Sequence, residues 1–318
     1  MITSVLVFLA ALASAAVLYP ITIRALTRAR MGQLIREEGP SSHHGKAGTP
    51  TAGGLLFIPI AVVLYLVADR HAAGALTLLG LLAGGALGLS DDLRKILARR
   101  NLGLRAREKF VIQLVTGAAL GYLAWRWGFD RQLVPFDGAP RLGAWLIPIG
   151  ALSVTAASNA FNLTDGSDGL AAGTGALAFA AIAVSALLQN QAGYATMPAV
   201  LSGVLAGFLL FNFYPARIFM GDTGSLALGT AMAAAALSTG LLWYLPVLGF
   251  VFVVETLSVI AQVASFKITG RRIFRMSPLH HHFHELGWPE PRVAVLSYAV
   301  GALAAAVVVI GAGRGPGS

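Results

Sequence analysis

The chain has 318 residues, of which 56% are hydrophobic and only 12% charged, and its mean hydropathy is +0.73. These values exclude an ordinary soluble domain and predict an all-α polytopic membrane protein. A formal net charge of +9 does not indicate nucleic acid as a partner, because the basic residues alternate with apolar runs and form no aromatic-interleaved groove. The absence of cysteine excludes disulfides and thiolate ligands.

Ten apolar runs predict about ten transmembrane helices, at residues 2–23, 52–67, 74–89, 111–127, 142–157, 170–188, 197–213, 225–242, 245–266 and 293–312. Since each span needs roughly 20 residues, we expect one integral membrane domain over residues 1–318 and no separate soluble domain. The last four residues resemble a cloning scar and are given no weight.

The distribution of charge predicts the topology. With the first loop in the cytoplasm, most of the 23 lysines and arginines fall in inner segments, so the positive-inside rule places both termini outside. The polar residues 128–143 contain Asp137-Gly138, which predicts a short outer hairpin between the fourth and fifth helices.

Residues 39–54 form a loop rich in glycine and proline after the first run. Its His43, its Lys46 and threonines such as Thr49 are donors suited to phosphate oxygens. A flexible connector would have the same composition, so both interpretations stay open.

The third run ends in the sequence Ser90-Asp91-Asp92-Leu93-Arg94-Lys95. Adjacent carboxylates at a membrane edge need a cation, a shared proton or a metal. The simpler alternative is that they cap a helix or pair with the cations that follow. Earlier in this run, small residues at four-residue spacing predict helix packing rather than chemistry: Gly80, Gly84 and Gly88.

Near the centre of the chain, residues 159–170 read NAFNLTDGSDGL and lie between two apolar runs. Lipid offers no hydrogen bonds to an irregular backbone, so this break must lie at an aqueous face or line a cavity. Asp165 and Asp168 are therefore expected to face water or a ligand.

Two later inner segments carry further polar groups. Asp222 lies among small residues where the eighth helix is expected to begin, and a helix N-terminus binds phosphate readily, although Asp222 could instead be only the N-cap.

The loop 271–292 contains a histidine run that is not a zinc signature and fits phosphate or sugar oxygens better. Surface histidines with no role are the alternative. Glu255, inside the ninth run, shows no partner and is assigned no catalytic role.

The inner segments thus bring five acids to one membrane face: Asp91, Asp92, Asp165, Asp168 and Asp222. Such a group needs a divalent cation, and oxygen ligands favour Mg²⁺, with Mn²⁺ as the alternative. A metal, cationic donors and a helix N-terminus suit a diphosphate substrate. We therefore expect an active site that opens to the cytoplasm and touches membrane lipid.

Five separated motifs, spread over nearly the whole chain, resemble those of the phospho-N-acetylmuramoyl-pentapeptide transferases, within the polyprenyl-phosphate sugar-1-phosphate transferase superfamily. They are His43–Gly54, Asp91-Asp92, Asn159–Leu170, Phe219–Gly229 and Pro278–Pro291. The His-His-His-Phe sequence followed by Gly-Trp-Pro-Glu-Pro resembles this branch rather than the N-acetylglucosamine-1-phosphate branch. The chain departs from the pattern of this branch at two positions, which affects only the detailed contacts of these loops. Ser167 replaces a residue that is usually apolar, and Glu285 comes one place later than the usual glutamate.

The resemblance implies ten helices with a broken ninth, a homodimer in the bacterial cytoplasmic membrane, and transfer of phospho-MurNAc-pentapeptide from UDP to undecaprenyl phosphate, giving lipid I and UMP. It implies Mg²⁺ held by Asp222 with Asp91 and Asp92, and catalytic roles for these three with His280 and His281. Phe219 resembles the uracil-stacking aromatic. The substrate-binding residues that it implies are Lys46, Thr49, Lys95, Arg107, Lys109, Asn159, Asn162, Asp165, Asp168, Asn212, Phe219 and His282.

In such a reaction an oxygen of the lipid phosphate attacks the β-phosphorus of the nucleotide sugar. The second pKa of a phosphate monoester is about 6, so positioning and electrostatics should matter more than a strong base. Asp91 as proton acceptor and a two-step route through an aspartyl-phosphate both stay open. Two other functions are to be tested: N-acetylglucosamine-1-phosphate transfer to the same lipid, and ion-coupled transport. Transporters place their acids near the bilayer midplane, whereas these fall at span ends.

Overall fold

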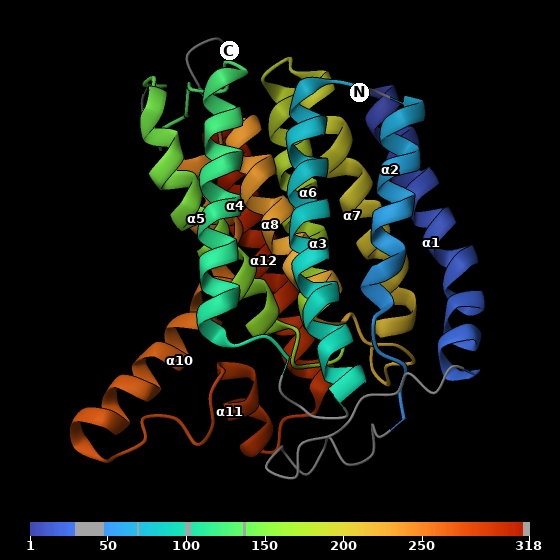
Figure 1. Ribbon diagram of the computed structural model, residues 1–318, viewed down its shortest axis with the longest axis vertical. Coiled ribbons are helices and arrows are strands. Elements are labelled where there is room, and N and C mark those ends of the chain that lie inside the picture. Colours follow the sequence, from blue (N-terminus) through green and yellow to red (C-terminus); the bar gives the residue numbers. More distant parts are fainter. Residues whose placement is uncertain (29–47, 69, 99–102, 136–137, 314–318) are drawn as a thin grey trace.

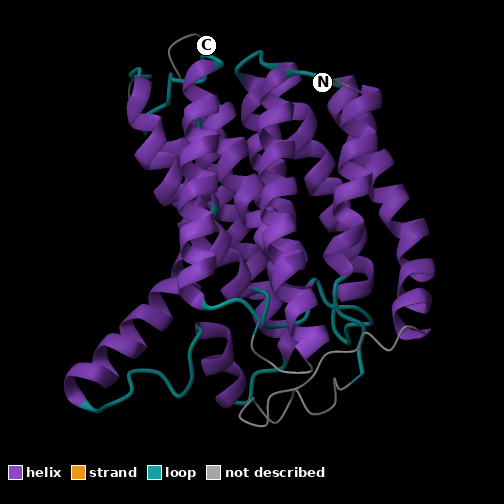
Figure 2. Ribbon diagram, in the orientation of Figure 1, coloured by secondary structure: helices purple, strands orange, loops and turns teal. Residues whose placement is uncertain are grey.

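A computed structural model describes residues 1–28, 48–68, 70–98, 103–135 and 138–313. Within these ranges the regular structure is entirely helical (Figures 1 and 2). The α-helices are α1 (Ile2–Arg28), α2 (Phe57–Ala68), α3 (Ala72–Ala98), α4 (Ala106–Arg126), α5 (Leu146–Thr164), α6 (Leu170–Leu188), α7 (Ala192–Asn212), α8 (Gly221–Ser238), α9 (Leu245–Leu248), α10 (Phe250–Thr269), α11 (Leu279–Glu285) and α12 (Glu290–Gly313). Short 3-10 helices are η2 (Gly53–Leu56), η3 (Gly143–Trp145) and η4 (Leu242–Tyr244).

The long helices form a bundle with two distinct ends (Figure 1). Helix α1 begins and α12 ends at one end, while α10 leans away from the bundle at the other, where α11 also lies. The predicted ninth helix is interrupted: Gly249 separates α9 from α10. The connection between α4 and α5 contains an antiparallel bridge between Arg131 and Arg141, at the end of the bundle where α1 begins.

Seven helices among the described residues are long and apolar enough to cross a membrane, so the chain is a multi-pass membrane protein. They are α1, α3, α5 with η3, α6, α7, α10 and α12. The remaining predicted spans correspond to α2, α4 and α8. Of these, α2 is short, and both α4 and α8 begin with a polar turn.

Helix α8 occupies the centre of the bundle. Every residue from Thr223 to Ser238 is buried, and the helix contacts α3, α4, α5, α6 and α7. Its alanines and glycines let neighbouring backbones approach closely, which is how helices associate in lipid. The polar first turn of α8 is therefore held at one end of the molecule by helices on several sides.

Candidate active site

Helices α3 and α8 pack closely because α3 turns its glycines toward α8. A Cβ at Gly84 would overlap the carbonyl oxygen of Leu226, and one at Gly88 would overlap that of Asp222. The predicted packing stripe is thus confirmed. This contact sets the acidic last turns of α3 directly against the first turn of α8.

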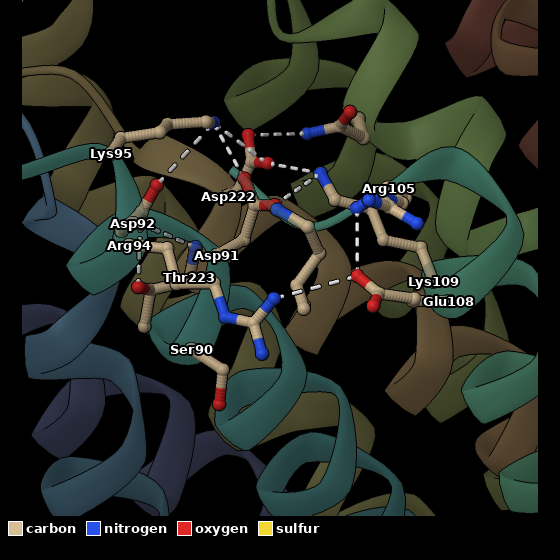
Figure 3. Close-up of polar contacts among 12 residues, drawn as sticks. Ser90, Asp91, Asp92, Arg94, Lys95, Arg105, Glu108, Lys109, Asp222 and Thr223 are labelled. Carbon is tan, nitrogen blue, oxygen red and sulfur yellow. Dashed lines mark hydrogen bonds and ion pairs between the residues drawn. The ribbon is translucent and has the colours of Figure 1, made fainter. Parts of the chain in front are cut away.

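Three carboxylates meet at this junction, those of Asp91, Asp92 and Asp222 (Figure 3). One oxygen from each lies within 4.8 Å of the other two. Asp91 is fully buried, and its Oδ1 accepts a hydrogen bond of 2.6 Å from the backbone N–H of Leu104. The structure therefore brings two adjacent acids, Asp91 and Asp92, together with Asp222, which follows about 130 residues later in the chain.

Two lysines lie against these acids. The Nζ of Lys95, on α3, is 2.7 Å from Asp91 and 3.0 Å from Asp222, and the Nζ of Lys109, on α4, is 3.0 Å and 2.9 Å from the same two residues. Figure 3 shows both side chains reaching Asp222. Three carboxylates outnumber two ammonium groups, so the cluster keeps a net negative charge.

Asp92 also has a structural role, since it caps α8 from outside that helix. Its Oδ2 accepts 2.9 Å and 2.7 Å hydrogen bonds from the backbone N–H and the hydroxyl of Thr223. Asp222 is not the N-cap, because Met220 holds that position. The capping interpretation thus applies to Asp92 and not to Asp222.

Helix α5 adds an amide to the cluster. The Nδ2 of Asn162 donates to Asp222 Oδ1 at 3.1 Å and to Ser225 Oγ at 2.8 Å. Asn159, about one turn earlier, instead donates to Gln113 Oε1 of α4 at 2.7 Å and to the Thr155 carbonyl. Asn162 thus belongs to the acid cluster, and Asn159 joins two helices.

The two predicted acids of the central loop have different surroundings. Asp168 is buried, and its Oδ2 accepts a 2.9 Å hydrogen bond from the N–H of Ala216. Asp165 ends α5, and its pKa is raised well above the usual value, first by burial and then by repulsion from Asp222, Asp92 and Asp168. Asp165 therefore shares the negative field of the cluster, while Asp168 joins two loops.

The predicted histidine run forms α11, and its residues do not all face the same way. The rings of His280, His281 and His284 contact one another, with centroids 4.2–6.0 Å apart. His282 points elsewhere, because its Nδ1 accepts a 3.1 Å hydrogen bond from the Arg275 N–H and its ring packs on Phe274. His284 therefore lies with His280 and His281, whereas His282 points away from this group, because neighbours in a helix point about 100° apart.

The other predicted residues lie as follows. Asn212 joins two loops, since it accepts from the N–H of Gly169 at 3.2 Å and donates to the carbonyl of Ile218 at 2.9 Å. The backbone of Phe219 pairs with Pro50 and Gly53 at 2.8 Å each, which ties the glycine-rich loop to the start of α8. Arg107 is exposed, Thr49 is half-buried, and Lys46 and His43 lie outside the described residues.

Two buried glutamates, to which the sequence assigned no role, have partners near the predicted loops. Glu255 is buried in α10 and its Oε2 accepts hydrogen bonds from the backbone N–H and Nδ1 of His280. Glu290, in the first turn of α12, accepts from the N–H of Asp168 at 3.0 Å and from Ser167 Oγ at 3.3 Å. A signal existed for Glu255, since an ionisable residue within a membrane span is costly and usually functional.

The donor set of the cluster fits a divalent cation. Mg²⁺ and Mn²⁺ prefer oxygen ligands such as carboxylates. Asp91, Asp92 and Asp222 each offer one carboxylate oxygen, and these three oxygens lie within 4.8 Å of one another. The negative charge left after pairing with both lysines favours such an ion. These three residues are the ones that could hold it.

Comparison with known proteins identifies the family. The profile of glycosyl transferase family 4 matches residues 74–240. A phospho-N-acetylmuramoyl-pentapeptide-transferase of Heliobacterium modesticaldum is 50% identical over 313 residues, covering 95% of this chain and 96% of the relative. Transferases of the same name from Geobacillus thermodenitrificans and Desulforudis audaxviator are 48% and 46% identical, covering 90% and 93% of this chain and 91% and 94% of the relatives. The chain therefore belongs to the phospho-N-acetylmuramoyl-pentapeptide-transferase family, within glycosyl transferase family 4.

Proposed function

We propose that this protein transfers phospho-N-acetylmuramoyl-pentapeptide from its UDP conjugate to undecaprenyl phosphate, forming lipid I and releasing UMP in peptidoglycan synthesis. The observation that carries the proposal is the meeting of Asp91, Asp92 and Asp222 with Lys95 and Lys109 at one end of the bundle. Phosphoryl transfer depends on positioning and on charge neutralisation, and this cluster supplies both kinds of group. The comparisons support the choice of sugar substrate.

The transfer step needs little covalent chemistry from the protein. An oxygen of the lipid phosphate forms a bond to the β-phosphorus, and the bond from that phosphorus to the bridging oxygen breaks, so that UMP leaves. Mg²⁺ held by the three carboxylates would supply charge neutralisation for the leaving group. Lys95 and Lys109 would bind phosphate oxygens, and Asn162 would keep Asp222 oriented.

We further propose that the site faces the cytoplasm in the bacterial inner membrane and that the protein works as a homodimer, as the family resemblance implies. The position of the cluster supports the sidedness. It lies at the end of the bundle opposite the start of α1 and the end of α12 (Figure 1), and basic residues accompany it: Lys95, Arg94, Lys109, Lys267, Arg271 and Arg272. Cytoplasmic segments are enriched in such residues.

The assay uses purified protein with Mg²⁺, undecaprenyl phosphate and one of two donors, UDP-MurNAc-pentapeptide or UDP-N-acetylglucosamine, and follows UMP release. We expect UMP from the first donor only. Asp222→Asn should abolish release, since it removes a charge at nearly constant volume, whereas Asp130→Asn at the other end of the bundle should keep wild-type turnover. Release from UDP-N-acetylglucosamine alone would refute the proposed substrate, and solute transport without UMP would refute the reaction.

A further inference from the structure

Glu255 and His280 form a buried pair that links α10 to α11. The Oε2 of Glu255 is 3.1 Å from Nδ1 of His280 and 3.2 Å from its backbone nitrogen. Glu255 is 4% exposed and His280 is 0% exposed. An ionised carboxylate accepts hydrogen bonds and donates none, so a contact with ionised Glu255 requires the proton on Nδ1 of His280.

The other ring nitrogen of His280 points at the central loop. A Cβ at Gly166 would lie 2.6 Å from Nε2 of His280 and 3.7 Å from Nε2 of His281. The Nε2 of His280 is buried, and among the described residues it has no hydrogen-bond partner. Buried polar atoms are nearly always satisfied, so this unsatisfied nitrogen, beside Gly166 and next to Asp165, calls for an explanation.

We propose that Glu255 is a positioning residue for the transfer reaction: it holds the proton on Nδ1 of His280 and turns Nε2 toward a phosphate or hydroxyl oxygen of the substrate beside Gly166. This inference rests on the proposed function and deepens it. Which nitrogen of a histidine is protonated is set by the hydrogen bond that the other nitrogen makes. If Nε2 donates to a phosphate oxygen, both nitrogens are protonated, and Glu255 provides the compensating negative charge.

A purely structural role would also use these contacts, since Glu255 fixes the first turn of α11 through the backbone of His280. The two roles differ in how substitutions combine. A residue that acts through His280 loses its effect once His280 is removed, whereas a residue that only stabilises the loop keeps its own effect. A double-mutant cycle therefore separates the two roles.

The experiment compares kcat/KM for wild type, Glu255→Gln, His280→Ala and the double variant, with Glu285→Gln as the matched control on the exposed side of the same loop. Loss of a carboxylate that orients a metal-ligating histidine typically costs about 10- to 100-fold, and we expect a loss in the same range for Glu255→Gln. The double variant should equal His280→Ala within about twofold. The control should keep wild-type activity.

A second measurement observes the pair directly in the wild-type protein. Nitrogen-15 NMR of the histidine rings, with the His280 signals assigned by their absence in His280→Ala, should show Nδ1 protonated in the wild type. An unprotonated Nδ1, a Glu255→Gln activity within twofold of wild type, or losses that multiply in the double variant would each overturn the inference. A wild type that releases no UMP would refute the proposed function instead, and the NMR result would still decide the state of the pair.

Discussion

At the scale of single residues, Asp165 differs from the acids of the cluster in its electrostatic surroundings. Lys95 and Lys109 contact Asp91 and Asp222, whereas the pKa of Asp165 is raised by burial and by the surrounding carboxylates. A carboxyl whose pKa is higher in the folded than in the unfolded protein contributes stability below its unfolded pKa, which is about 3.9. This contribution is lost as the pH rises through the folded pKa.

Asp165→Asn should therefore raise the thermal unfolding midpoint at neutral and higher pH when no divalent cation is present. Its advantage over wild type should shrink as the pH falls through the folded-state pKa toward about 4, because the Asp165 carboxyl of the folded wild type is then neutral, as the amide is. Thermal unfolding in detergent with a chelator, measured between pH 4 and pH 8, checks this.

Asp168→Ala is the contrasting variant in the same loop. It removes the acceptor of the Ala216 N–H and should lower the midpoint at every pH. An Asp165→Asn curve that coincides with wild type throughout would show that Asp165 is not kept neutral by its surroundings.

At the scale of helices, the sequence predicts the elements better than their contacts. Apolar runs predict the long helices, because membrane-spanning helices need long apolar stretches, and the glycine stripe of α3 is confirmed as a packing surface. The facing directions within α11 could not be read from the sequence, because the sequence did not show that this segment is helical, and a helix places residues four apart on one face. Lys109 and Arg107 differ for the same reason, since residues two apart on a helix point in different directions.

Gly84→Ala tests the contact between α3 and α8. The added methyl would overlap the carbonyl oxygen of Leu226 and approach Thr230 Oγ1 to 2.7 Å, and such overpacking costs about 1–3 kcal/mol. We expect a lower unfolding midpoint and reduced turnover, because the helices that carry the acids must separate.

Gly301→Ala is the matched control on α12. There the added methyl would be 3.6 Å from Leu177 Cδ1, an ordinary contact, so stability should hold or rise slightly, since alanine favours helix. If Gly84→Ala were as stable and active as Gly301→Ala, close packing of α3 on α8 would not be what positions the cluster.

At the scale of the whole molecule, the bundle turns distant sequence segments into one site. The sequence predicted that Asp91, Asp92 and Asp222 meet, because each lies at the inner end of a predicted span. It could not predict that Glu255 would hold His280, since that contact depends on how α10 leaves the bundle and how α11 folds back (Figure 1). Contacts between helices that are far apart in sequence are set by tertiary packing, which local patterns do not encode.

The central claim is that carboxylates from α3 and α8 hold one divalent cation where the transfer occurs. The most direct measurement is anomalous scattering from Mn²⁺ in crystals of the wild type and of Asp222→Asn. We predict one strong peak in the wild type, with oxygens of Asp91, Asp92 and Asp222 as the nearest protein atoms at a metal–oxygen distance of about 2.0–2.2 Å, and a lost or much weaker peak in the variant. A wild-type peak elsewhere, or a peak of equal strength in Asp222→Asn, would contradict the claim.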